Sequence, residues 1–154
     1  MSVFFFDSSA ITKKYVKEIG TAWVISIFRP KLSNRVYITE IALVEVISAL
    51  TRRHRGKTIT TDNFTKVSNR FRRNFADKFF KTEINLSVIE QAATLAEKYA
   101  LRGYDAIQLA SAVNLHSRRQ KAGLPPLVFV SADNALNTAA KDEGLQIDNP
   151  NNHP

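Results

Sequence analysis

The chain has 154 residues, 44% of them apolar, which is enough to bury one hydrophobic core in a single domain. It contains no cysteine, so disulfides and thiolate metal sites are excluded, and no apolar stretch approaches the roughly 18 residues that a membrane span requires. The formal net charge is +8, and residues 52–81, with ten basic and two acidic residues, account for all of it.

The first half of the chain alternates short apolar runs with helical patterns. Residues 3–6 (VFFF) are too few and too continuously apolar for an amphipathic helix, and they indicate a strand that is buried on both faces. In chain order, the patterns predict a strand at 3–6, helices over 8–18 and 21–29, a strand at 35–38, a helix over 40–55 capped by Thr39, and a helix over about 61–80.

The second half continues in the same way. In chain order, it predicts a strand at 81–86, a helix over 88–100 behind a capping box of Ser87 and Glu90, a helix over 104–121, a strand at 127–130, a helix over 134–144 and a strand at 145–147. Continuously apolar strands separated by helices predict a mostly parallel sheet with helices on both faces, an α/β fold. We expect one domain over residues 1–148 and a loose polar tail at 149–154.

Two aspartates come at or just beyond the ends of predicted strands. Asp7 comes after VFFF, and Asp133 comes shortly after LVFV. In open parallel sheets the ligand crevice lies beyond the carboxyl ends of the strands, so both carboxyls are expected there. The alternative is that each aspartate only caps the helix that follows it.

Two further acids lie inside predicted helices, where no cap is needed. Glu45 is part of IALVEVISAL, a run that is apolar on nearly every side, and an ionised carboxylate there must face a polar or cationic group. Asp105 shares a helical face with Leu109 and Ala112, so it is expected to point inward, although a cap-adjacent acid is an alternative.

If Asp7, Glu45, Asp105 and Asp133 converge, their charges require either retained protons or a cation. An all-oxygen site suits Mg²⁺ or Mn²⁺, and such ions activate water and stabilise charge during phosphodiester cleavage. A localised positive charge attracts polyanions such as nucleic acid. Together these features indicate a metal-dependent nuclease, in a soluble protein that we expect in the cytoplasm.

Four sequence blocks resemble those of a known family. FFFDSSAITKKYVKEIGT, VEVISALTRR, LRGYDAIQLASAVNL and VFVSADNALNTAAKDEGLQIDNP are similar, in order and spacing, to the acidic blocks of the PIN-domain ribonucleases, above all to the toxins of VapBC-type toxin–antitoxin pairs. The resemblance implies a three-layer α/β/α sandwich, RNA cleavage with Mg²⁺ or Mn²⁺, a homodimer, and inhibition by a small cognate antitoxin.

The resemblance also implies roles for individual residues. Asp7, Glu45, Asp105 and Asp133 match the four family acids in turn, and Ser131 matches the hydroxyl residue that orients the neighbouring carboxylates. It implies that Asp7 and Asp105 hold the principal metal ion with help from Asp133, and that Glu45 acts through water or a second ion.

The basic segment leaves two questions open. Arg70, Arg72 and Arg73 could contact RNA phosphates. The phenylalanines of the same helix could either stack on RNA bases or pack on a neighbouring helix, a dimer partner or an antitoxin. A non-catalytic RNA-binding or interaction module on the same fold would need only this segment, and is the alternative function. A phospho-accepting receiver domain is disfavoured, because Asp7 has no acid beside it and no lysine follows a late strand.

Overall fold

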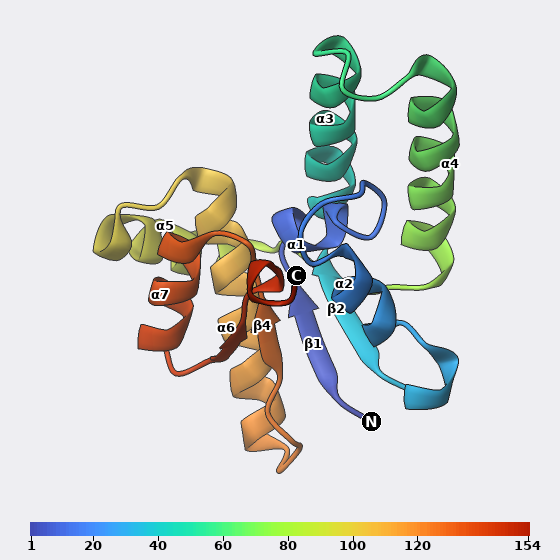
Figure 1. Cartoon of the computed structure of the whole chain (residues 1–154). Helices are drawn as coiled ribbons and strands as arrows, with labels where there is room; N and C mark the ends of the chain where they lie inside the picture. Colours follow the sequence, from blue (N-terminus) through green and yellow to red (C-terminus); the bar gives the residue numbers. More distant parts are fainter.

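The computed structural model covers residues 1–154 and is built around one parallel sheet (Figure 1). Its strands are β1 (Val3–Phe6), β2 (Arg35–Thr39), β3 (Phe80–Thr82), β4 (Val128–Val130) and β5 (Gln146–Asp148). They are ordered β3-β2-β1-β4-β5, and each neighbouring pair is parallel.

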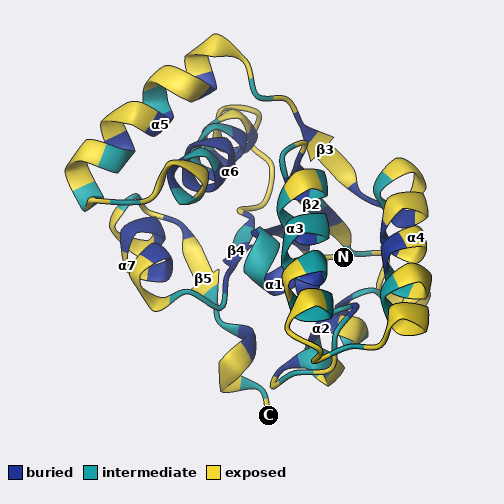
Figure 2. Cartoon of the chain, turned by 90° about the horizontal axis from the view of Figure 1, so that it is seen from above, coloured by how far each residue is buried: buried dark blue, intermediate teal, exposed yellow.

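Helices cover both faces of the sheet (Figure 2). One face is covered by α1 (Ser8–Thr12), α2 (Thr21–Ile27), α3 (Ala42–Arg55) and α4 (Thr61–Asp77), and the other by α5 (Leu86–Tyr99), α6 (Gly103–Lys121) and α7 (Asn134–Asp142). The predicted α/β/α sandwich is therefore confirmed. None of these helices is both long and apolar enough to cross a bilayer.

The apolar run of β1 supplies side chains to two separate cores. Phe5 stacks on Phe129 in the core beneath α5, α6 and α7, whereas Phe6 packs with Val36 and Ile38 in the core beneath α2, α3 and α4. Successive side chains of a strand point to opposite faces, so a central strand needs apolar residues at every position. Each fully buried phenylalanine contributes about 1.5–3 kcal/mol of hydrophobic stabilisation. The run in β1 thus holds its carboxyl end, and Asp7 after it, in a fixed place.

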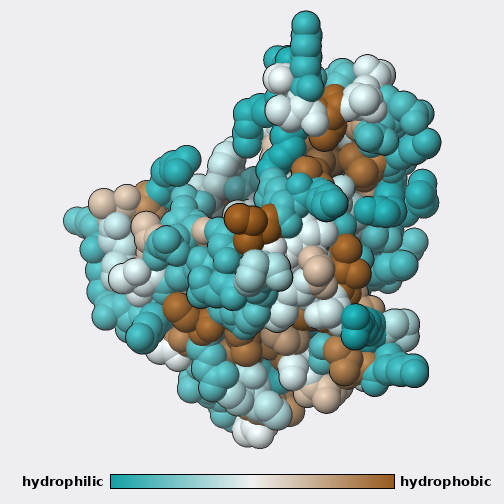
Figure 3. All heavy atoms as spheres, in the orientation of Figure 1, coloured by the Kyte–Doolittle hydropathy of each residue, from teal (hydrophilic) through white to brown (hydrophobic).

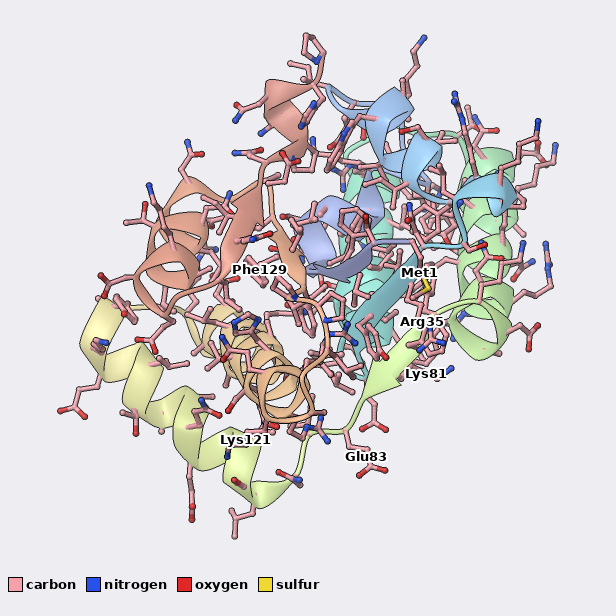
Figure 4. The ribbon with its side chains drawn as sticks, turned by 90° about the horizontal axis from the view of Figure 1, so that it is seen from below. Met1, Arg35, Lys81, Glu83, Lys121 and Phe129 are labelled. Carbon is pink, nitrogen blue, oxygen red and sulfur yellow. The ribbon has the colours of Figure 1, made fainter.

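The strand order reverses at β1 and β4. The chain moves outward from β1 to β2 and β3, then returns across the sheet to place β4 on the other side of β1. At such a reversal the loops after the two strands diverge and leave a crevice at their carboxyl ends. The opposite end of the sheet, seen from below in Figure 4, carries Met1 and Arg35.

Several element boundaries differ from those predicted. The first helix stops at Thr12 and the chain continues in tight turns, because Lys14 and Tyr15 donate their amide hydrogens to carbonyls three residues earlier. β2 extends to Thr39, which therefore cannot cap α3. Asn85, and not Ser87, caps α5: its Oδ1 accepts from the amide of Val88.

The C-terminal tail is ordered, so the expectation of a loose tail is wrong. Residues Pro150–Asn152 form a 3₁₀ turn in which Pro150 is buried. The ring of His153 stacks on Trp23 of α2 with centroids 4.2 Å apart, and its Nε2 lies 2.8 Å from Asp148 Oδ1. Gly20 has a φ of +85° and packs so closely on Pro150 that a Cβ would lie 2.2 Å from the Pro150 carbonyl oxygen. Aromatic stacking and close backbone packing, neither visible in the polar sequence, hold the tail.

Candidate active site

The four predicted acids line one pocket at the carboxyl ends of β1 and β4. Asp7 follows β1, Asp133 follows β4, and Glu45 and Asp105 lie in the first turns of α3 and α6. The pocket has a volume of about 360 Å³, and we call it the acid pocket. In the space-filling view a notch separates the protruding α3–α4 pair from the rest of the molecule, and hydrophilic side chains dominate its edges (Figure 3).

Asp7 is buried at the base of the acid pocket, with 3% of its surface exposed. Its Oδ1 accepts hydrogen bonds from the Ser9 hydroxyl (2.7 Å) and the Ala10 amide (2.9 Å), and its Oδ2 accepts one from the Ser131 hydroxyl (2.7 Å). These bonds favour the ionised form, but burial outweighs them and raises the pKa of Asp7 to about 6. Asp7 therefore holds its charge at a considerable cost in this environment.

Ser131 joins the ends of the two strands. Its hydroxyl donates to Asp7, and the same oxygen accepts from the Asp133 amide at 3.1 Å. Asp133 in turn accepts the Leu136 amide at 2.9 Å as the N-cap of α7, just as Asp7 caps α1. The capping interpretation of both aspartates is thus correct, and it coexists with their place in the acid pocket.

Glu45 faces polar groups, as expected for a carboxylate in an otherwise apolar helix. Its Oε2 accepts from the hydroxyl of Ser8 and from Nε2 of Gln108, both at 2.5 Å, while its Oε1 has no hydrogen-bond partner. Gln108 is fully buried, and its own Oε1 accepts from Thr39 at 3.3 Å. Burial raises the pKa of Glu45, the two hydrogen bonds oppose this, and the charge of Asp105 adds to it.

Asp105 is half-buried at the first turn of α6. It forms an ion pair with the exposed Arg102, with Nε 3.7 Å from Oδ2. Burial raises the pKa of Asp105, the neighbouring charge of Asp133 raises it further, and Arg102 opposes the shift. Burial and neighbouring like charges therefore raise the pKa values of Asp7, Glu45 and Asp105, as expected for carboxyls gathered in a partly desolvated pocket.

The donor set of the acid pocket fits a hard cation. Every candidate ligand is a carboxylate oxygen, and several of these oxygens accept no hydrogen bond from the protein, among them Glu45 Oε1 and Asp133 Oδ2. No three acidic or histidine side chains are drawn together closely enough to form a ready metal site.

Basic side chains also line the acid pocket, and they are not the ones that the sequence indicated. The lining cations are Lys13, Arg52, Arg53 and Arg102. Arg52 and Arg53 lie seven and eight residues after Glu45 in α3, which is two helical turns along the same face. That spacing was visible in the sequence and could have identified them, as could the position of Gln108, three residues after Asp105 in an apolar helix.

Arg70, Arg72 and Arg73 are exposed on α4, and none of them lines the acid pocket. Arg70 lies over the ring of Tyr15, with its guanidinium carbon 5.2 Å from the ring centroid. The phenylalanines of α4 pack inward, with Phe71 fully buried, so the prediction that they pack on a neighbouring helix is confirmed. RNA contact by the three arginines stays a prediction.

A larger hollow, of about 500 Å³, lies between β3, the start of α5 and the end of α6. Glu83 is the only acid that lines it. Convergent polar groups with perturbed pKa values mark a functional site better than volume does, so the acid pocket remains the candidate.

The sequence matches the family model described as "PIN domain" over residues 4–142. The chain belongs to the PIN-domain family. Among curated proteins, this PIN domain is 29% identical to ribonuclease VapC45 of Mycobacterium tuberculosis over 153 residues, which cover 96% of the chain and 95% of that protein.

Solved structures share the fold of this PIN domain. A toxin–antitoxin complex from Klebsiella pneumoniae matches it with a TM-score of 0.54 at 18% identity, over 84% of this chain and 86% of the other. PAE2754 from Pyrobaculum aerophilum matches with a TM-score of 0.59 at 18% identity, over 96% and 90%. At these identities the likeness is one of fold.

Proposed function

We propose that this PIN domain is a divalent-metal-dependent endoribonuclease and the toxin of a toxin–antitoxin pair. The observation that carries the proposal is that four carboxyls from four separate segments line one pocket that is also edged by lysine and arginine. Membership of the PIN-domain family and the likeness to a protein named ribonuclease VapC45 support the RNA substrate. The likeness to a structure described as a toxin–antitoxin complex supports a small antitoxin partner.

In this proposal Asp7, Asp105 and Asp133 hold the metal ion, and Glu45 assists through water or a second ion. A bound Mg²⁺ or Mn²⁺ would polarise the scissile phosphodiester and offset the negative charge that develops on it. Ser131 fixes Asp7 and Asp133 relative to each other through its two hydrogen bonds. Gln108 and Ser8 hold Glu45 by one oxygen, which leaves Oε1 free.

The raised pKa of Glu45 gives this free oxygen a second role. A carboxylate whose pKa is shifted toward neutrality takes up a proton more readily than an ordinary one. Glu45 Oε1 is therefore the atom that we propose receives the proton of the attacking water. The remaining parts of the proposal, a homodimer and a cytoplasmic location, follow from the family resemblance and from the absence of cysteine.

Cleavage of single-stranded RNA by the purified protein tests the proposed function. With Mn²⁺ we expect cleavage that excess chelator abolishes and that Asp7→Asn lowers on the order of 100-fold or more, because the variant loses the buried ligand charge. Asp77→Asn makes the same change at an exposed position of α4 and should cleave normally. RNA binding without cleavage in any metal would instead favour a non-catalytic RNA-binding module.

A further inference from the structure

A single glutamate ties two cations together at the wall of the acid pocket. Lys13 Nζ donates to Glu18 Oε2 at 3.1 Å and to the carbonyl oxygen of Ile19 at 3.0 Å. Arg53 Nη2 donates to the other oxygen of Glu18. The three residues, here called the ion trio, join the turns after α1 to the last turn of α3, and all three line the acid pocket.

The position of Lys13 is costly and needs a reason. Its side chain is 6% exposed, and the other lysines of the chain are less buried. A lysine can usually keep its ammonium in water while burying its stem, and burial of the charge costs free energy even when the charge is paired. An ion pair at the open surface would avoid this desolvation cost. The placement instead brings an ammonium group to the pocket that contains the acids.

The ion trio keeps spare hydrogen-bond donors and an excess of positive charge. Lys13 uses two of its three N–H groups, and Arg53 has five donors, of which the Glu18 contact occupies one. One carboxylate against two cations leaves a net charge of +1. Guanidinium and ammonium groups with free donors are the side chains that bind phosphate oxygens best.

The loop that carries Glu18 is itself held firmly. The Glu18 amide donates to Thr21 Oγ1 at 2.9 Å, and the same hydroxyl donates to the Val16 carbonyl at 3.2 Å. Two residues after Glu18, Gly20 packs against Pro150 of the C-terminal tail. The Glu18 carboxylate therefore has a fixed position, and it holds the side chains of Lys13 and Arg53 in place.

We infer that Lys13 and Arg53 bind a phosphate of single-stranded RNA beside the scissile bond, and that Glu18 is the positioning residue that holds both cations in place. The inference rests on the proposed nuclease function and extends it. The carboxylates and their cation act on one phosphodiester, while the ion trio fixes the chain next to it and so sets the register of cleavage. Glu18 touches no substrate and acts only through its two partners.

Binding of a fluorescent single-stranded RNA tests the two cations, with every protein carrying Asp7→Asn to prevent cleavage. Lys13→Met and Arg53→Met should each raise the Kd about tenfold and lower the slope of log K against log salt by about 0.7, the value for one lost phosphate contact. Lys17→Met and Arg55→Met remove the same charge at exposed positions outside the pocket. If the pocket variants match these controls, the inference is wrong.

Substitution of Glu18 tests the positioning role, because it changes the net charge in the opposite direction from the lysine and arginine variants. Glu18→Gln raises the net charge by one, which on charge alone strengthens RNA binding. A positioning role predicts instead that kcat at saturating RNA falls about tenfold, because a misplacement of about 1 Å costs about 100-fold in rate and a smaller one costs correspondingly less. Glu90→Gln makes the same charge change on the exposed face of α5 and should leave kcat unchanged. Equal kcat values for the two variants would overturn the role of Glu18.

The outcomes separate this inference from the proposed function. If the wild-type protein cleaves RNA and the Arg53→Met and Arg55→Met variants bind alike, the nuclease proposal survives and the phosphate site does not. If the wild-type protein binds RNA through Lys13 and Arg53 but does not cleave it in the presence of any metal ion, the phosphate site survives and the nuclease proposal does not. Circular dichroism checks that each variant folds. If Glu18→Gln does not fold, the comparison of Arg53→Met with Arg55→Met tests the phosphate site on its own.

Discussion

The ends of β1 and β4 present the same local motif in two different environments. Asp7 and Asp133 both follow a buried strand, both cap the next helix, and both bond to Ser131. Asp7 is buried between α1 and the neighbouring strand, whereas Asp133 is only partly buried. Local sequence thus sets the capping role of each aspartate, whereas tertiary packing buries Asp7 and raises its pKa.

The largest expected difference between the two aspartates concerns stability in chelator. The pKa of Asp7 is raised from 3.8 to about 6, so the folded state binds this proton more tightly than the unfolded state. The associated stabilisation is complete below about pH 4 and is lost as the pH rises to about 6. Asp7→Asn has no such loss, and its free energy of unfolding relative to wild type should rise by about 3 kcal/mol between about pH 3 and pH 7.5.

Urea unfolding at the two pH values measures this difference. Asp133→Asn is the matched control, because it neutralises the equivalent carboxyl at the end of β4. Parallel pH profiles for wild type and Asp7→Asn would show that Asp7 is not desolvated in the folded protein.

A divalent cation bound at the end of β1 should stabilise the folded protein with Asp7 ionised. At about 100 times its Kd, Mn²⁺ is expected to stabilise the wild-type protein by about 2.7 kcal/mol, which corresponds to a rise in Tm of about 5–10 °C. The rise should vanish in Asp7→Asn, shrink in Asp133→Asn, and persist in Asp77→Asn, whose side chain is exposed on α4. Differential scanning calorimetry measures it without RNA. Equal rises in all four proteins would place the bound ion elsewhere.

The smallest expected effect isolates the capping role at β4. Asp133→Ala removes the acceptor of the Leu136 amide and should destabilise the protein by about 1 kcal/mol. Asparagine caps helices as well as aspartate does, so Asp133→Asn should cost only a small fraction of this. Urea denaturation measures the loss of stability in each of the two variants. An asparagine variant as unstable as the alanine variant would mean that the charge, and not the cap, supports α7.

The order of elements and the gathering of the acids could be predicted because both depend on short-range patterns. A continuously apolar run marks a central strand, and an acid at its end is carried to the crevice by any parallel sheet. Glu45 was predictable for a different reason: an unpaired charge inside an apolar helix must find a partner. Its partners, Ser8 and Gln108, were not, since they lie 37 and 63 residues away.

The cationic side of the site was harder to predict because positive charge is abundant in this chain. Charge density pointed to Arg70, Arg72 and Arg73, but helical register relative to Glu45 would have pointed to Arg52 and Arg53. The ion trio depends on Glu18 meeting Arg53 across 35 residues, and no local pattern encodes that contact. The prediction of a loose tail was wrong for a similar reason, because His153 is held by Trp23, which is 130 residues away.

The docked tail makes the two chain ends unequal as attachment points. Met1 is 76% exposed and lies at the end of the sheet opposite the acid pocket (Figure 4), so an affinity tag or fluorescent protein there projects into open solvent. A fusion after Pro154 would instead pull on the His153 ring and on Pro150, whose neighbour Gly20 borders the loop of Glu18. Purification handles for this protein therefore belong at its amino terminus.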